Sequence, residues 1–391
     1  MSFTQQDIWI AHHFYANSCA YNIPITLRFT GALSKEVLEF SINEIIRRHE
    51  ILRTTFTVKE GQPVQIVAPC LTLPLEIVDL QHRSLEEREA LVRELANLEA
   101  QHHFELASGP LIKTTLLQLA TSEHWLLITM HHIITDGWSI GIFLHELETL
   151  YSTFLNGLSS PLPEVAVQYA DFTLWQRKWL NEEGLQKQFS YWQKKLADFP
   201  KTLDLLLTKK SQLNTNSRRA SFYSIVLPET QVAAIEALSR SQGVTIFTII
   251  LTVLKILLFK WSGQTDIIVE ATTTNRSTPE IEQMLGCFIQ DVYLRSKVDG
   301  SLTGLTLLEQ VKQTVSEAIN NQEIPRKKLS EEILGKVEYL STMNVIMAPP
   351  VRRHGQILEY ENVELLLEGE LWDEVTPLAL YIPSPHDWSL D

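Results

Sequence analysis

The sequence is poor in cysteine, in basic residues and in long apolar runs. Its 391 residues include three cysteines, far apart at Cys19, Cys70 and Cys287. This pattern excludes a disulfide framework and a CxxC metal site, and it is typical of the reducing cytoplasm. The 33 Lys and Arg against 47 Asp and Glu leave a net charge of −14. Because nucleic acid binding requires concentrated basic residues, we expect a cytoplasmic protein without a nucleic acid partner and without a metal site.

Long apolar runs of the kind that cross membranes are also missing. The first residues, MSFTQQD, have neither the basic region nor the apolar core of a signal peptide. The most apolar stretch, residues 244–261, is interrupted by Lys255 and contains three threonines, so it falls short of the about 20 apolar residues that span a bilayer. We expect a buried amphipathic helix there, and no membrane partner.

What is present is a mixed pattern of helices and strands. In the first half the periodicity predicts strands and helices, and capping signals support two helices, Ser34 for one and Ser84 with Glu87 for another. The polar stretch 208–219 resembles the end of a linker, after which the pattern restarts. The sequence therefore predicts an α/β protein with two halves of similar size. The expected strands are 23–29, 110–118, 124–130, 222–227 and 266–271; the expected helices are 34–50, 84–101, 138–154, 229–241 and 245–259.

Three His-His pairs occur, at 12–13, 102–103 and 131–132, and only the third has an acid four residues after its second histidine. The segment 131–137, HHIITDG, follows a predicted strand and precedes a predicted helix. A neutral imidazole in such a turn can accept a proton, Asp136 can fix the turn, and the Gly137 N–H can face an oxyanion. The alternative is a helix that Asp136 caps, with the histidines as ordinary turn residues. The motif by itself leaves both interpretations open.

A second motif overlaps the first. Residues 137–141, GWSIG, match the G-x-S-x-G elbow of serine hydrolases. An elbow requires its glycine directly after the strand, but here seven residues separate Met130 from Trp138. The downstream His354 and the pair His386-Asp387 do not supply the Asp-then-His order of those enzymes. The sequence therefore disfavours a hydrolase.

Residues 131–139, HHIITDGWS, resemble the HHxxxDGWS motif of condensation domains from nonribosomal peptide synthetases. Five more segments resemble the other motifs of that family in the same order. They are residues 2–9 with 21–24, 48–56, 169–176, 285–289 with 294–295, and 321–325. Six motifs in order cover nearly the whole chain and identify it as similar to this family.

This resemblance implies an α/β fold of two chloramphenicol-acetyltransferase-like halves, arranged as a V-shaped pseudo-dimer with a tunnel between them. We expect the first half at residues 1–178, a connecting segment at 179–219 and the second half at 220–391. The second half would lack the last strand and helix of the family, because the chain stops at Asp391.

The implied reaction is amide formation. The amine of an acceptor attacks the thioester of an acyl or aminoacyl donor held on phosphopantetheine. The implied partners are donor and acceptor carrier proteins or flanking synthetase modules. The chain itself would bind no cofactor. It shows no adenylation signature and no carrier serine motif, so carriers would act in trans or belong to a longer synthetase.

By the same resemblance His132 is the central residue of the site, either as a general base or to orient the amine, and His131 supports it. Asp136 would be structural and paired with an arginine, for which Arg276 and Arg53 are the candidates. Gly137 would stabilise the tetrahedral intermediate through its N–H. The residues expected to line the tunnel are Trp138, Ser139 and Gln290.

The chain departs from the family motifs at several positions. Asp7 stands where the first motif usually has arginine, and Gln290-Asp291 stand where the fifth usually has Asn-Thr. The sixth motif departs at Arg326 and Lys327, and no convincing seventh motif precedes residues 342–347. The run 326–328 is either a solvated surface or a local charge that steers acidic carriers.

Two other functions stay open for the same fold. An acyl-CoA-dependent acyltransferase shares HHxxxDG, but not the other five motifs. A catalytically silent docking module would account for the departure at Gln290-Asp291 and for the early end of the chain. The intact His132, Asp136 and Gly137 count against that second alternative.

Overall fold

A computed structural model describes residues 1–14, 19–179, 182–200, 227–276 and 278–334. The predicted linker 208–219, the strand 222–227 apart from its last residue, and the segment 342–347 lie outside the described residues. The downstream histidines His354 and His386 also lie outside them.

A four-stranded sheet forms the centre of the first half, in the order β1-β6-β5-β4. Its strands are β1 (Asn22–Thr30), β4 (Glu76–Asp79), β5 (Ile112–Ala120) and β6 (Glu123–His131). β6 runs antiparallel to both of its neighbours, whereas β4 is parallel to β5. The three predicted strands of this half are confirmed; β4 was not predicted.

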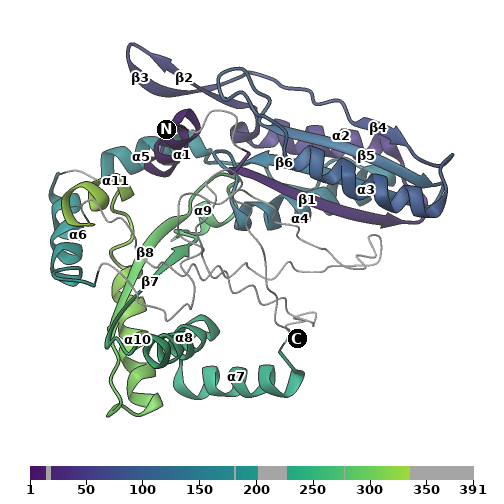
Figure 1. The fold of residues 1–391 in the computed structure, drawn as a ribbon. Coiled ribbons are helices and arrows are strands. Elements are labelled where there is room, and N and C mark those ends of the chain that lie inside the picture. Colours follow the sequence, from purple (N-terminus) through teal and green to yellow (C-terminus); the bar gives the residue numbers. More distant parts are fainter. Residues whose placement is uncertain (15–18, 180–181, 201–226, 277, 335–391) are drawn as a thin grey trace.

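Helices cover both faces of this sheet (Figure 1). α2 (Lys35–Arg48) and α4 (Gly137–Leu155) pack on one face, and α3 (Leu85–Ala100) packs on the other. Alternate side chains of β6 serve the two cores, with Ile128 on the α2 and α4 side and Leu127 on the α3 side, as expected for a strand buried on both faces. All three helices were predicted.

Both capping predictions are also confirmed. The Ser34 side chain accepts a hydrogen bond from the Val37 N–H at the start of α2. Ser84 and Glu87 form a complete capping box at the start of α3, in which each side chain accepts from the backbone of the other. Such caps satisfy amide groups that the first turn of a helix leaves without an acceptor.

For several further elements of the first half, no helix or strand was predicted from the sequence. They are α1 (Phe3–Phe14), the short helix η1 (Glu50–Arg53), the hairpin of β2 (Thr54–Lys59) with β3 (Gln62–Val67), and α5 (Tyr169–Trp179). Of the aromatic residues of α5, Tyr169 and Phe172 are buried in the core, while Trp175 is exposed.

The second half is built on the antiparallel pair β7 (Asp266–Thr273) and β8 (Gln290–Lys297). The helices α8 (Ile246–Ser262) and α10 (Gly304–Ile319) pack against it, and α7 (Glu229–Gln242) lies against α8 (Figure 1). The predictions of α7, α8 and β7 are confirmed. The short elements α9 (Pro279–Glu282), α11 (Arg326–Leu329) and η2 (Ser330–Leu334) complete the described residues.

α6 (Glu182–Lys195) falls within the predicted connecting segment, yet it contributes Phe189 and Trp192 to the core of the second half. Trp192 is fully buried, and its indole N–H donates to the Asn321 carbonyl at 2.7 Å. The domain boundaries at 178 and 219 stay predictions, and 219 lies outside the described residues.

The crossing segment, residues 278–289, connects the two halves. The chain between β7 and β8 leaves the second half, and its residues Ile281, Met284, Leu285 and Phe288 are buried in the core of the first half. This segment contains the first part of the fifth family motif, residues 285–289. It therefore carries residues of one half directly to the end of β6 and the start of α4.

No single helix among the described residues is long and apolar enough to cross a membrane, although α7 and α8 would pass together by length and composition, with a bend of 106° between them. As predicted, the apolar stretch 244–261 forms mostly a helix, α8, with a buried face. Cys19, Cys70 and Cys287 all lie within the described residues and form no disulfide bond there.

A lysine lies inside the second core. Lys255 of α8 is fully buried and donates hydrogen bonds to the carbonyls of Ile267 and Leu294. Burial lowers the pKa of its amine from 10.5 to about 7, with a further lowering by the charge of Lys195. The folded chain thus binds this proton less readily than the unfolded chain does.

We expect the stability contribution of Lys255 to rise with pH between about 7 and 10.5, because in this window the unfolded chain binds more protons than the folded one. The limiting slope is about 1.4 kcal/mol per pH unit. Urea unfolding of wild type and Lys255→Met at pH 7, 8 and 9 isolates this term. The difference between their free energies of unfolding should shift in favour of the wild type at each increase in pH. A difference that is independent of pH would contradict the prediction.

Candidate active site

The segment 131–136 forms a tight turn between β6 and α4. The backbone N–H of His131 donates to the Leu111 carbonyl, and that of His132 donates to the Tyr21 carbonyl. Inside the turn, the Gln5 side chain of α1 donates to the Ile133 carbonyl at 3.1 Å. The turn is therefore held by three separate parts of the first half.

His132 is partly buried, and one of its ring nitrogens has a defined partner. Nδ1 lies 2.8 Å from the Thr135 carbonyl, which can only accept, so Nδ1 carries the proton. Nε2 is then the basic nitrogen, and it makes no hydrogen bond with the residues that the structure describes. The geometry thus selects the tautomer in which the unshared lone pair is available to a substrate.

Asp136 is fully buried and uses both carboxylate oxygens. Oδ1 accepts from the Ser139 N–H at 2.8 Å, which makes Asp136 the N-cap of α4. Oδ2 accepts from the Phe288 N–H at 2.9 Å. The capped-helix interpretation of the motif is therefore correct for Asp136, and it is compatible with the catalytic interpretation of His132.

Arg276 is the partner of Asp136. Its Nη2 lies 3.1 Å from Oδ1 of Asp136, and both side chains are shielded from solvent, at 1% and 0% exposure. The Arg276 guanidinium also donates to two carbonyls of the crossing segment, and it stacks 4.1 Å above the ring of Phe288. Because β7 leads into Arg276, this ion pair joins the two halves at the active-site turn.

Arg53 was the other candidate partner and does not contact Asp136. Its guanidinium donates to the Ala68 carbonyl and to the Glu50 carboxylate. Arg53 closes η1, and these contacts join that short helix to the end of β3. A supporting role for Arg53 in the site therefore has no geometric basis.

Ser139 is fully buried, which corrects the prediction that it lines the tunnel. Its hydroxyl donates to the Gly286 carbonyl at 2.8 Å and accepts from Arg276 and from the Gly286 N–H. With no base beside it and no exposure, the hydroxyl cannot act as a nucleophile. The serine of the hydrolase motif thus has a structural role, because its hydrogen bonds connect α4 to the crossing segment.

The remaining predicted residues lie in two places. Gly137 is exposed as the first residue of α4, where N–H groups have no acceptor within the helix. Trp138 is half-buried, and its indole N–H donates to the Glu282 carbonyl at 2.8 Å. Gln290 is buried, and its amide donates to the Ile324 carbonyl. Gln290 therefore joins β8 to the start of α11, and its place in a tunnel stays a prediction.

His131 is buried, and desolvation holds its pKa well below the usual value, so its ring is neutral. Nδ1 accepts from the Ile133 N–H and stiffens the turn. The ring packs edge-on against His12 at 5.2 Å, and His12 stacks on His103 at 6.0 Å. One histidine from each of the three pairs thus meets here, which their spacing in the sequence could not show.

Sequence reasoning assigned no role to the residues that surround this turn from the fifth motif. The Cys287 sulfur lies 3.5 Å from Nδ1 of His132. Burial raises the pKa of the thiol well above its usual value, so the thiol stays neutral. Tyr169 donates to the Cys287 carbonyl and is also fully buried. In the sequence, the fifth motif marked these residues, but their contact with α4 depends on the tertiary fold.

Among the described residues, no group of histidine, cysteine and acidic side chains could hold a metal ion.

Comparisons with known proteins show the family of the chain. Residues 1–338 match the family model of the condensation domain. The chain therefore belongs to the condensation domain family, as the resemblance predicted.

Relatives in synthetases are similar over most of the chain. A linear gramicidin synthase polypeptide of Brevibacillus parabrevis is 39% identical over 333 residues, which cover 85% of this chain and 6% of the relative. Malpinin synthetase of Mortierella alpina is 34% identical over 387 residues, which cover 96% of this chain and 5% of the relative. The chain thus spans a small fraction of the length of these relatives.

Solved structures confirm the α/β fold of chloramphenicol-acetyltransferase type. The first condensation domain of the calcium-dependent antibiotic synthetase, solved with a substrate analogue, superposes with a TM-score of 0.77. That match is 19% identical and covers 90% of this chain and 80% of the other. The X-domain from teicoplanin biosynthesis has a TM-score of 0.75 at 23% identity, with 88% of this chain and 76% of the other covered.

We expect removal of either member of the Asp136–Arg276 pair to destabilise the protein by about 3–5 kcal/mol, because the other charge stays buried without compensation. Urea unfolding of Asp136→Ala, Arg276→Met and the double variant should show coupling above about 0.5 kcal/mol. The partly exposed pair Arg28–Glu123 serves as control, and its coupling should be smaller than that of the buried pair. A fully stable but inactive Asp136→Ala variant would contradict the structural role.

We also expect Gly286→Ala to destabilise the fold. The φ of Gly286 is 153°, and a Cβ there would lie 2.0 Å from the ring of Tyr169. Both the backbone and the buried ring resist such a change, so the free energy of unfolding should fall by about 1–3 kcal/mol. Thermal unfolding of Gly300→Ala is the matched control, since nothing lies within 4 Å of that added methyl group.

Proposed function

We propose that this chain catalyses amide formation between a carrier-bound acyl or aminoacyl thioester and an amine acceptor. The observation that carries the proposal is the hydrogen bond from His132 Nδ1 to the Thr135 carbonyl, which leaves Nε2 as a free base. The buried Asp136–Arg276 pair holds the turn around it. An acyl transfer to nitrogen requires such a base and no nucleophilic side chain.

The chemical steps follow from this arrangement. The lone pair of the acceptor nitrogen attacks the carbonyl carbon of the thioester, and the carbonyl oxygen becomes an oxyanion. Collapse of this intermediate breaks the C–S bond and leaves an amide. His132 Nε2 accepts the proton that the nitrogen loses and returns it to the departing thiolate. The exposed Gly137 N–H at the start of α4 is the donor for the oxyanion, aided by the helix dipole.

The substrates and partners are part of the same proposal. The relatives are long synthetases, of which this chain matches one segment, so donor and acceptor arrive on phosphopantetheine arms of carrier proteins or flanking modules. We further propose that the enzyme works in the cytoplasm, in keeping with three cysteines that form no disulfide bond among the described residues.

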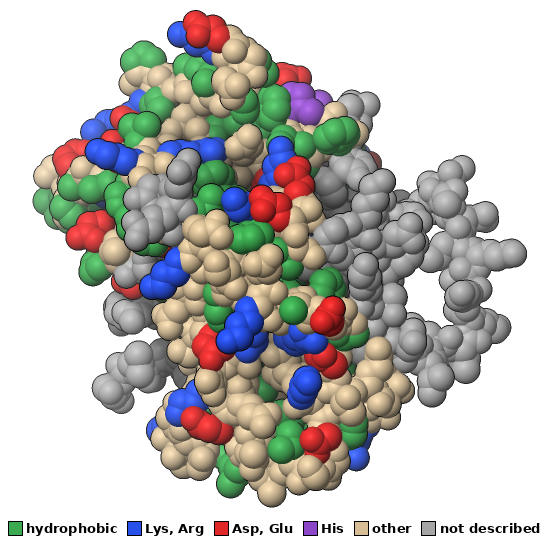
Figure 2. Space-filling view, turned by 90° about the vertical axis from the view of Figure 1, so that its left-hand side faces the viewer, with side chains coloured by type: hydrophobic (Ala, Val, Ile, Leu, Met, Phe, Trp, Pro, Cys, Tyr) green, Lys and Arg blue, Asp and Glu red, His purple; other side chains and the backbone are tan. Residues whose placement is uncertain are grey.

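Steering of acidic carriers by residues 326–328 is not supported by the charges around them. Arg326 is paired with Asp291 at 3.2 Å, Lys327 with Glu331 at 3.9 Å and Lys328 with Glu332 at 3.5 Å. Figure 2 shows that Lys and Arg side chains on this face alternate with Asp and Glu and do not form one basic patch. Long-range attraction of an acidic partner needs uncompensated charge, which this run does not offer.

A docking module is the second candidate. It is favoured by the similarity to the X-domain from teicoplanin biosynthesis, which has also been solved as a complex with OxyB. Chains of this fold therefore also serve in protein complexes. The accessible Nε2 of His132 favours an enzyme in the present case, because a pure docking function gives no reason for this tautomer. An acyl-CoA-dependent acyltransferase remains the third candidate, distinguished by its donor.

We expect His132→Ala to lower amide formation by at least about 100-fold, the usual contribution of a general base. The assay combines a carrier loaded with an aminoacyl group, an amine acceptor and detection of the product by mass. His145→Ala, at an exposed position of α4, is the matched control and should retain full activity. No turnover by the wild type with any thioester, while carriers still bind, would instead support the docking module.

His132→Gln separates the two roles left open for the imidazole. Glutamine can accept a hydrogen bond and orient the amine, but it cannot take up its proton. Activity within about tenfold of the wild type would assign orientation to His132, and a loss as large as that of His132→Ala would assign proton transfer.

Ser139→Ala should reduce the stability of the protein more than its catalytic activity. Loss of activity at unchanged stability would favour a hydrolase.

A further inference from the structure

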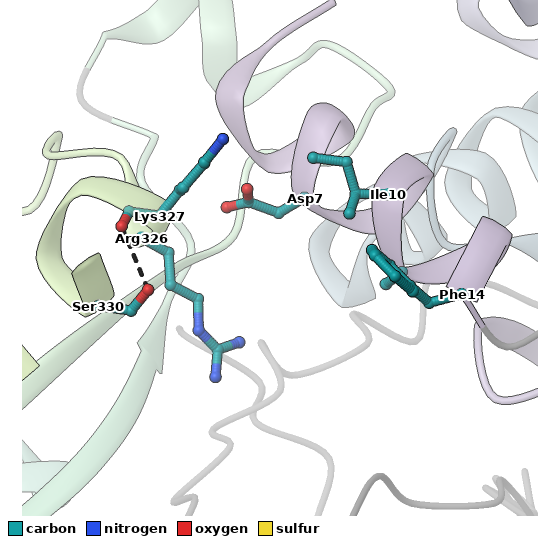
Figure 3. A pocket seen from close by; sticks show the side chains of 7 residues that line it. Asp7, Ile10, Phe14, Arg326, Lys327 and Ser330 are labelled. Atoms are coloured by element: carbon teal, nitrogen blue, oxygen red, sulfur yellow. Dashed lines mark hydrogen bonds between the residues drawn. The ribbon is translucent and has the colours of Figure 1, made fainter. Parts of the chain in front are cut away.

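A cavity of about 640 Å³ lies between α1 of the first half and α11 of the second half. Asp7, Ile10, Ala11 and Phe14 of α1 form one wall (Figure 3). The opposite wall consists of Arg326, Lys327 and Ser330. Groups of opposite charge thus face each other where the two halves meet.

The charged residues here are the same ones at which the chain departs from its family motifs. Asp7 replaces the usual arginine of the first motif, Asp291 belongs to the altered fifth motif, and Arg326 and Lys327 form the altered end of the sixth. These positions are far apart in the sequence, yet Arg326 lies 3.2 Å from Asp291 and shares the cavity with Asp7. Because these altered positions lie close together in the fold, they indicate one combined change of charge where α1 faces α11.

The two cations of α11 differ in how firmly they are held. Arg326 contacts Asp291 at 3.2 Å and Glu270 at 3.7 Å, which anchors it to β7 and β8. Lys327 has only Glu331 within ion-pair distance among the described residues, at 3.9 Å, and both of these side chains are more than half exposed. Such an exposed pair is weak. Lys327 is therefore held less firmly than Arg326, and its side chain can move toward charge on the opposite wall.

Asp7 has no hydrogen bond or ion pair within the described residues. Figure 3 shows its carboxylate pointing across the cavity toward α11. Burial raises its pKa to about 6, an effect opposed chiefly by the charge of Arg326 and also by Lys327 and Arg177. At neutral pH the group is therefore ionised, and its strongest attraction is toward α11.

The opposite side of α1 contacts the active site. Gln5, two residues before Asp7, donates to the Ile133 carbonyl of the turn that carries His132. Thr4 donates to the Ile289 carbonyl just before β8. A shift of α1 relative to α11 would therefore reach the catalytic turn through one hydrogen bond.

We propose that Asp7 is a positioning residue, whose charge pairs across the cavity with Lys327 and Arg326 and holds α1 against α11. Through Gln5, α1 then holds the turn of His132 at its distance from the second half. This charge pair holds the two walls of the cavity together. The charge at position 7 is negative, opposite to that of the arginine that the family motif usually has there.

The test is a double-mutant cycle of Asp7→Asn and Lys327→Gln, with kcat and KM for the amine acceptor as readouts. Arg326 is left intact because it also holds Asp291 and Glu270. We expect Asp7→Asn to lower kcat about fivefold in the wild type and less than twofold in the Lys327→Gln background. Effects that simply multiply would overturn the proposal. Glu94→Gln, an exposed change of the same charge on α3, is the control.

Two further variants guard against a loss of folding as the explanation. The swapped pair Asp7→Lys with Lys327→Glu should recover most of the activity that Asp7→Lys alone loses. In 1 M KCl, where the screening length is about 3 Å, wild type and Asp7→Asn should become alike. Absence of rescue together with an effect that resists salt would overturn the proposal.

A readout independent of catalysis is the distance between the halves. Spin labels at Glu89→Cys on α3 and Leu305→Cys on α10, both exposed, report it by pulsed electron resonance after Cys19 and Cys70 are replaced by serine. Asp7→Asn should broaden or shift the distribution, and the swapped pair should restore it. An unchanged distribution would overturn the proposal even if the chain forms no amide, a result that would separately refute the proposed function.

Discussion

The buried ion pair of Asp136 and Arg276 is the constraint on which the active-site region depends. Two charges with almost no exposure to water are tolerated only when each finds a partner and their remaining hydrogen-bonding groups are largely satisfied. Asp136 meets this demand by capping α4 and by accepting from Phe288, so its position requires both halves. The pair thus couples helix capping, the contact between the halves and the orientation of the catalytic turn in one interaction.

Neighbouring residues of the site have different roles, some structural and one chemical. His131 is neutral and buried, and it stiffens the turn, whereas His132 presents a free Nε2. Ser139, which a short motif would make a nucleophile, is enclosed by Arg276 and Gly286 and serves only to join α4 to the crossing segment. Within this motif of nine residues, one imidazole thus performs the proton transfer that we propose, and its neighbours hold it in place.

Predictions from local pattern succeeded where local physics decides the outcome. Ser34 and Ser84 cap helices as expected, because the groups they satisfy lie within three residues. The same reasoning overlooked β4, since a short parallel strand is stabilised by a distant neighbour, β5. It could not choose between Arg53 and Arg276 for Asp136, because each lies far from it along the chain. It also placed Ser139 at a tunnel, since burial by residues about 147 positions away leaves no local signal.

The sequence by itself determined the class of fold, the family and the catalytic histidine that we propose, because six motifs in order and a strand–turn–helix pattern are readable along the chain. The tertiary structure alone decided which arginine neutralises Asp136, which ring nitrogen of His132 is basic, and that residues altered in the first and sixth motifs face one cavity. The physical reason is the same in each case. Charge compensation, tautomer and burial depend on atoms that meet only when the two halves pack together.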